Sequence, residues 1–179
     1  MLDIDIKIAA PSQLMSDLIR EAEKKAEDVI QKLKELSLTI ALSESCTAGL
    51  VAALLANTNG ASSVLWGSYV CYTQEAKVSM LCLDNDELLA YGLVSRETAS
   101  SMAGMALKKS GADIAVSVTG IAGPDGDGRV QPGTVFIAAG SLNRGITEKE
   151  FHFEGSRNEV RFLAATAVLE EILGILSNN

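Results

Sequence analysis

The sequence predicts an α/β protein, namely a three-layer α/β/α sandwich whose mixed sheet has about five strands. Two observations lead to this fold class. Short apolar segments alternate with segments of helical periodicity, as where residues 38–42 precede the apolar helix at 49–57. Residues 133–140 and 146–153 are joined only by the short connection LNRG, which suits antiparallel but not parallel strands. Helices on both faces of a mixed sheet satisfy both patterns.

The N-terminal part of the chain divides into an extension and the start of the main domain. Residues 2–8, LDIDIKI, alternate apolar and charged side chains and predict a short exposed strand within an extension over 1–15. Residues 16–179 are expected to form a single domain. Its first helix, at 16–36, combines an apolar stripe with a charged, solvated face.

The remaining elements follow from periodicity and from capping residues. The predicted elements are a strand around 67–72, a helix from 74 capped by Thr73, a short helix at 85–91 ended by Gly92, a helix from Ser95 to about 109 closed by Gly111, a strand at 113–119, and a helix at 158–176 whose capping box is Ser156 and Glu159. Residues 119–133 hold five glycines and two prolines and predict a long loop.

Charge and cysteine content narrow the classes of function. A formal net charge of -8 over 179 residues opposes a nucleic-acid footprint, which needs clustered lysine and arginine. No N-terminal signal pattern and no run of roughly 18 apolar residues is found, so we expect a cytoplasmic protein without membrane contact. Cys46, Cys71 and Cys82 lack CxxC spacing and predict free thiols rather than a disulfide or a zinc site.

Two polar loops follow predicted buried strands, where open α/β sheets bind their ligands. In SESCTAG, the start of the next helix together with Ser45, Thr47 and Gly49 suits an anion such as a phosphate, although the same residues also cap helices without a ligand. In TGIAGP, Gly120 and Gly123 allow the backbone to approach a ligand, or serve tight turns.

Metal and histidine chemistry have little support in the sequence. DGDG at 125–128 lacks the third acidic pair and the distal glutamate of a calcium loop, so a plain turn is predicted. The one histidine, His152, lies between two phenylalanines in an alternating strand and is predicted to be a solvated strand residue. No metal and no cofactor is expected. A serine or threonine nucleophile would therefore need lysine, tyrosine or a carboxylate as its base, which draws attention to Ser62, Tyr72 and Lys77.

Five segments together resemble the CinA C-terminal domain family. In chain order they read ESCTAGLVAALL, GASSVLWGSYVCYTQEAK, YGLVSRETASSMAGMAL, ADIAVSVTGIAGPDG and FEGSRNEVRFLAA. The resemblance covers residue 16 to the end. It implies a three-layer α/β/α serine amidohydrolase that needs no metal and is usually a homodimer. Its stand-alone (PncC-like) members deamidate nicotinamide mononucleotide, giving nicotinate mononucleotide and ammonia.

The resemblance also implies roles for individual residues. Ser62 would be the nucleophile, Tyr72 and Lys77 its proton-transfer partners, and Thr119 and Arg157 would lie around the substrate. The sequence departs from the family pattern at four places, of which the shortened loop bears on substrate preference because it would border the pocket. The four departures are Ala48 in place of glycine, Ala61 in place of the first serine of GSS, the missing residue in QPGTV, and the shortened loop at 125–133.

The chemistry sets two conditions on this assignment. A lysine base must be neutral, so the pKa of Lys77 has to fall toward roughly 7 to 8, and we expect its amine to be buried with few carboxylates nearby. Ser62 and Tyr72 are ten residues apart, about 33 Å if fully extended, so the chain must fold back before Gly67 or a second subunit must complete the site. The alternative function is a non-catalytic nucleotide-binding or protein-interaction module, and a nucleotide phosphatase is a weaker one.

Overall fold

The computed structural model describes residues 12–177, so the strand predicted at residues 2–8 lies outside the described residues. Helix α1 (Gln13–Leu36) begins after Ser12, whose side chain accepts a hydrogen bond from the amide of Met15. The boundary expected at residue 16 therefore falls inside this helix. Its apolar stripe is buried and its charged face is exposed, as the periodicity predicts.

Five strands form one mixed sheet, which confirms the predicted fold class. They are β1 (Ile40–Glu44), β2 (Leu65–Val70), β3 (Ile114–Gly120), β4 (Thr134–Ser141) and β5 (Gly145–His152), in the spatial order β2-β1-β3-β4-β5. Strand β1 is parallel to both β2 and β3, whereas β4 is antiparallel to β3 and to β5. The carboxyl ends of the parallel strands β1, β2 and β3 therefore lie together at one end of the sheet.

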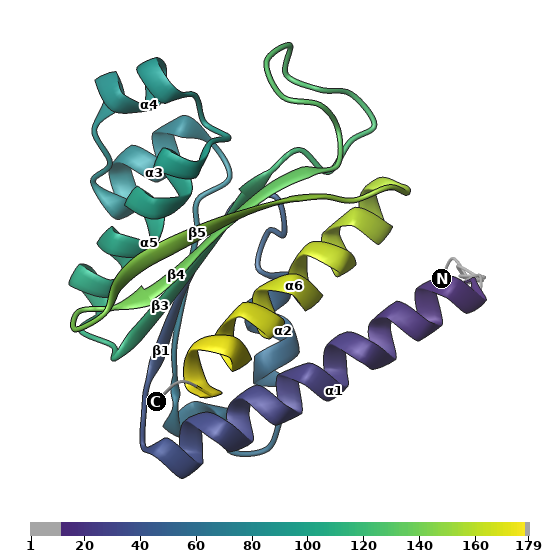
Figure 1. Ribbon diagram of the computed structural model, residues 1–179, viewed down its shortest axis with the longest axis vertical. Coiled ribbons are helices and arrows are strands. Elements are labelled where there is room, and N and C mark those ends of the chain that lie inside the picture. Colours follow the sequence, from purple (N-terminus) through teal and green to yellow (C-terminus); the bar gives the residue numbers. More distant parts are fainter. Residues whose placement is uncertain (1–11, 178–179) are drawn as a thin grey trace, which may run out of the picture.

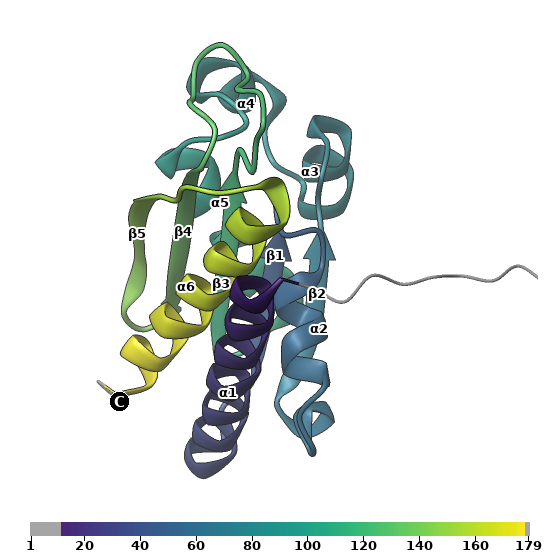
Figure 2. The ribbon, with the colours of Figure 1, turned by 90° about the vertical axis from the view of Figure 1, so that its right-hand side faces the viewer.

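Helices cover both faces of the sheet (Figures 1 and 2). On one face lie α1, α2 (Leu50–Ala56) and α6 (Arg157–Ser177), and on the other lie α3 (Gln74–Leu81), α4 (Asn85–Tyr91) and α5 (Arg96–Ser110). The long loop between β3 and β4 rises above the carboxyl ends of the parallel strands (Figure 1). A short 3-10 helix, η1 (Ala61–Ser63), precedes β2.

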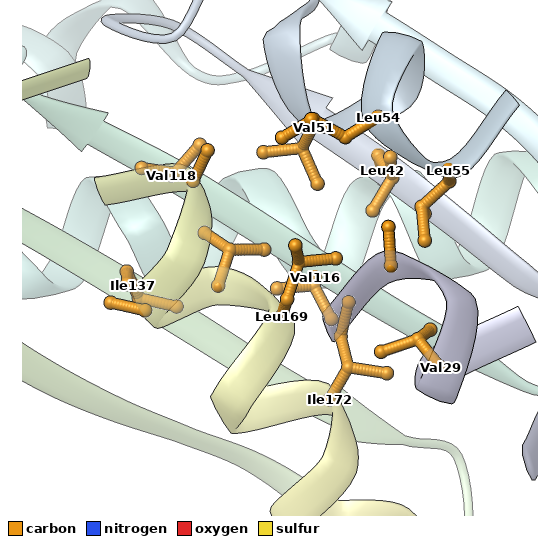
Figure 3. Packing of buried hydrophobic residues seen from close by; sticks show 14 of the residues in the cluster. Val29, Leu42, Val51, Leu54, Leu55, Val116, Val118, Ile137, Leu169 and Ile172 are labelled. Atoms are coloured by element: carbon orange, nitrogen blue, oxygen red, sulfur yellow. The ribbon is translucent and has the colours of Figure 1, made fainter. Parts of the chain in front are cut away.

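The larger core fills the space between the sheet and the α1/α2/α6 layer. Val29 of α1, Leu42 of β1 and Val116 of β3 meet Leu169 and Ile172 of α6 there (Figure 3). All five side chains are at most 1% exposed. Burial of a side chain of this size contributes roughly 1.5 to 3 kcal/mol, so this layer holds the parallel strands in place from behind.

The predicted caps are confirmed. Thr73 accepts a hydrogen bond from the amide of Ala76 at 3.2 Å, and Ser95 accepts one from the amide of Thr98 at 3.0 Å. The Ser156 amide donates to Glu159 at 2.7 Å, which is half of the capping box that starts α6. These caps fix the points at which α3 and α6 enter the site.

Strand β2 contradicts the fold-back before Gly67, which is one of the two predicted ways of bringing Ser62 to the site. It begins at Leu65 and continues through Gly67 to Val70, paired with β1 along its length. A bulge between Leu65 and Gly67 absorbs one residue, and Gly67 takes a φ of +145° there. Gly67 thus serves an irregularity within the strand and not a reversal of the chain.

Among residues 12–177, no helix is long and apolar enough to cross a membrane.

Candidate active site

A cavity of about 270 Å³ opens at the carboxyl ends of the parallel strands. Both polar loops singled out from the sequence contribute to its wall, as does the first residue of α6. The expected site residues that line it are Ser45, Tyr72, Lys77, Gly120, Gly123 and Arg157. Strand topology explains this meeting, because Ser45, Cys71 and Ile121 directly follow the ends of β1, β2 and β3.

Lys77 and Ser45 form the central contact of the cavity. The Nζ of Lys77 donates to Ser45 Oγ at 2.9 Å and to the carbonyl oxygen of Cys71 at 2.9 Å. Lys77 lies in the second turn of the helix capped by Thr73, and its side chain is 1% exposed. A hydroxyl and an amine at this distance are the geometry of a nucleophile with its base.

Burial lowers the pKa of Lys77, as a general base requires. Loss of water around the amine lowers the pKa of Lys77 from 10.5 to about 8, and the two nearby thiols of Cys71 and Cys46 oppose this only in part. No carboxylate contributes to the shift. The predicted burial of Lys77, with few carboxylates near its amine, is therefore confirmed.

Cys46 follows Ser45 and also lines the cavity, so it is the other nucleophile to consider. Burial raises the pKa of the Cys46 thiol to about 12, which keeps it protonated at neutral pH. Thiolate, not thiol, is the reactive form of cysteine. Ser45 is therefore the side chain in this wall that a neighbouring base can activate.

Ser62 is not brought to Lys77 within the chain. It lies in η1, before the amino end of β2, in a shallow groove with Thr39 and Trp66. Lys77 follows the carboxyl end of the same strand, and six residues of extended strand span about 20 Å. The expected pairing of Ser62 with Lys77 within one chain is wrong, because strand β2 separates them; the other predicted route to this pairing is a second subunit.

Two residues expected at the substrate instead serve the structure around it. The hydroxyl of Thr47 donates to Glu44 at 2.8 Å, and that of Thr119 donates to the carbonyl oxygen of Leu93 at 3.0 Å. Both side chains are 0% exposed, and neither lines the cavity. Gly49 is the N-cap of α2 with a φ of +90°, so its role is conformational.

Glu44 occupies the amides at the start of α2, so a phosphate cannot bind there. Its carboxylate accepts hydrogen bonds from the amides of Val51 and Ala52 at 3.1 and 3.0 Å. These are the donors that an anion at this helix end would use. Of the two uses left open for SESCTAG, the structure favours capping over anion binding, with the cap supplied by a glutamate and not by Ser45 or Thr47.

Two residues that shape this region, Glu44 and Arg161, were not predicted from the sequence. Glu44 ends a strand in which every residue is buried, and a buried carboxylate is rare enough to have been a signal. Arg161 donates from Nη2 to the carbonyl oxygen of Thr47 at 2.8 Å, across 114 residues of chain. No local sequence pattern indicates the hydrogen bond between Arg161 and Thr47.

The remaining wall carries opposite charges. Arg157 begins α6 and is exposed, while Asp125 and Asp127 lie in the loop after β3. Asp127 accepts from the amides of Arg129 and Val130 at 2.9 and 2.8 Å, and these two donors lower the pKa of its carboxyl group. This geometry confirms the plain turn that DGDG predicted.

Free backbone donors occur among the residues that line the same cavity. Within residues 12–177 the amides of Ala122 and Gly123 donate to no protein acceptor, whereas the amide of Cys46 donates to its own Sγ. Tyr72 is 55% exposed at the edge of the cavity. Within residues 12–177 its hydroxyl forms no hydrogen bond with Ser45 or Lys77, so Tyr72 has no direct proton-transfer contact with either side chain.

His152 does not line this cavity. His152 is exposed on β5, where its Nδ1 is 3.3 Å from the hydroxyl of Thr134. In the described part of the chain, no group of three or more histidine, cysteine or acidic side chains is arranged to hold a metal ion.

Curated relatives resemble this chain over part of their own length. A CinA-like protein from Syntrophomonas wolfei is 43% identical over 142 residues, which are 78% of this chain and 33% of that protein. A CinA-like protein from Thermotoga neapolitana is 40% identical over 151 residues, which are 84% of this chain and 36% of that protein. This chain thus spans about a third of the length of these relatives.

Solved structures match nearly the whole chain. A competence/damage inducible protein, CihA, from Agrobacterium tumefaciens superimposes with a TM-score of 0.83 at 34% identity, over 96% of this chain and 99% of that one. A CinA superfamily protein from Escherichia coli gives a TM-score of 0.81 at 27% identity, over 93% and 94%. The family model for the CinA C-terminal domain matches residues 22–176. The chain belongs to the CinA C-terminal domain family.

Proposed function

We propose that this protein is an amidohydrolase that converts nicotinamide mononucleotide to nicotinate mononucleotide and ammonia, with Ser45 as its nucleophile. The observation that carries the proposal is the 2.9 Å contact between Ser45 Oγ and the buried amine of Lys77 in the wall of a cavity. The choice of substrate comes from the resemblance to the deamidases of this family. Nicotinamide mononucleotide carries the carboxamide and the phosphate that this wall can address.

Neutral Lys77 accepts the Ser45 proton as the serine oxygen attacks the carboxamide carbon. Its pKa of about 8 leaves a useful fraction of the amine neutral near pH 7 and still lets it hold the proton afterwards. The proton then passes to the departing nitrogen, and ammonia leaves an acyl-enzyme that water hydrolyses. Tyr72 delivers a proton only through bound substrate in this scheme.

The groups that would bind the substrate are the donors of the cavity wall that have no partner among the described residues of the protein. The amides of Ala122 and Gly123 are the donors for the oxyanion of the tetrahedral intermediate. Arg157 pairs with the phosphate, since the start of α2 is occupied by Glu44. Gly120 is required beside them, because a Cβ there would lie 2.7 Å from the carbonyl oxygen of Thr134.

The cytoplasm is the proposed location of this activity. The support is the cysteine content, since Cys46, Cys71 and Cys82 are all free thiols.

We also propose that the protein is a homodimer joined along β2. Strand β2 is one edge of the sheet and carries no charged residue, while Trp66 on it is 50% exposed. The other edge, β5, is blunted by charged side chains such as Lys149 and Glu150. An uncharged edge strand is a surface on which another strand can pair.

Substitution of the nucleophile tests the activity. We expect Ser45→Ala and Lys77→Met to lower kcat for ammonia release from nicotinamide mononucleotide by about 10³-fold or more, because each removes half of the dyad. Ser62→Ala is the matched serine control and should keep kcat within about twofold of the parent. Loss of activity in Ser62→Ala with retention in Ser45→Ala would reverse the assignment. An inactive parent would instead favour the non-catalytic binding module.

The pH dependence follows from the pKa of Lys77. Because the base must be neutral, log kcat/KM should rise with a slope of +1 as the pH approaches about 8 and then level off. The Ser62→Ala variant should give the same curve. Initial rates between pH 6.5 and 9.5 would measure it, and a flat or falling profile would contradict Lys77 as the base.

Light scattering after size-exclusion chromatography tests the dimer. The parent should elute at twice the chain mass and Trp66→Glu at the chain mass, because a charge on the β2 edge opposes strand pairing. Leu142→Glu is the control, since Leu142 is 79% exposed on the opposite hairpin and should not affect assembly. A monomeric parent or a dimeric Trp66→Glu variant would overturn the proposal.

A further inference from the structure

Glu44 is a buried acidic side chain that forms no ion pair within residues 12–177. Only 1% of it is exposed. A carboxylate taken out of water in this way is costly unless hydrogen-bond donors replace the lost water. The four donors that surround Glu44 show which segments of the protein its side chain connects.

The donors come from three segments. Glu44 Oε2 accepts from the hydroxyl of Thr47 at 2.8 Å and from the amide of Val51 at 3.1 Å. Its Oε1 accepts from the amide of Ala52 at 3.0 Å and from the hydroxyl of Ser68 at 3.0 Å. The carboxylate thus joins the loop that carries Ser45, the first turn of α2 and the edge strand β2.

Thr47 is held from two sides. Its hydroxyl donates to Glu44, and its carbonyl oxygen accepts from Arg161 of α6 at 2.8 Å. Ser45 itself is fixed at its backbone, where its amide donates to the carbonyl oxygen of Val118 and its own carbonyl oxygen accepts from the amide of Ala48. Few conformations of residues 45–48 satisfy all of these contacts together.

We propose that Glu44 is a positioning residue for the nucleophile, which it holds in register with Lys77 by anchoring the loop through Thr47. This inference rests on the proposed function, since it assigns Glu44 a part in the reactivity of Ser45. Ser45 directly follows Glu44, so rotation of the loop would carry Oγ away from Lys77 Nζ. A misplacement of about 1 Å can cost roughly 10²-fold in rate.

Two hydroxyls on the same carboxylate provide a matched test. Thr47→Val removes the hydroxyl that donates to Glu44 from the loop carrying Ser45, whereas Ser68→Ala removes the hydroxyl that donates to Glu44 from β2. Each variant keeps the other three hydrogen bonds of Glu44. For Thr47→Val we expect kcat to fall about tenfold or more with KM within about twofold, and Thr47→Ser, which keeps the hydroxyl, to restore the rate. Ser68→Ala should keep kcat within about twofold although it loses a bond to the same group.

A second readout does not depend on nicotinamide mononucleotide. The rate at which a fluorophosphonate labels Ser45, followed by intact-protein mass spectrometry, should fall about tenfold or more in Thr47→Val and stay within about twofold in Ser68→Ala. A parent that is labelled but releases no ammonia would contradict the proposed function and still allow this comparison. Equal losses in the two variants, or no loss in Thr47→Val, would reduce Glu44 to a purely structural residue and overturn the inference.

Discussion

The dehydration of the Lys77 amine is the constraint on which the rest of the site depends. A lysine in water is a cation and cannot take a proton from serine, whereas at 1% exposure the charged form loses its solvation and the pKa falls to about 8. The surroundings must then avoid restoring the charge. They do so by giving the amine a hydroxyl and a backbone carbonyl as hydrogen-bond partners, and no carboxylate raises its pKa.

The fold supplies this arrangement through its parallel strands. Strands β1 and β2 end side by side, so Ser45 and the loop that leads to Lys77 meet although 32 residues separate them in the chain. The α1/α2/α6 layer packs behind the strands and fixes their ends (Figure 3). Arg157 and Arg161 stand about one turn apart at the start of α6; Arg157 lines the cavity, and Arg161 is hydrogen-bonded to the loop that carries Ser45. One helix thereby contributes both to the cavity wall and to the position of that loop.

The sequence predicted the fold well because its signals are local. Apolar periodicity, Thr73, Ser95 and the Ser156–Glu159 box act within a few residues, and each was found where expected. The two loops of the cavity were also predictable, since strand ends define the crevice. Which serine lies beside Lys77 was not predictable. Whether Ser45 or Ser62 meets Lys77 depends on the path of β2, and the role of Glu44 depends on three segments that meet only after folding.

The most direct test of this account is the titration of the Lys77 amine itself. Lysine labelled with 13C at Cε gives one NMR signal for each side chain, and the signal of Lys77 is the one missing from the spectrum of Lys77→Met. The account predicts a midpoint near pH 8 for that signal, well below the ordinary lysine value of 10.5. A midpoint at the ordinary value of 10.5 would show a charged amine at neutral pH and would contradict the Ser45–Lys77 mechanism.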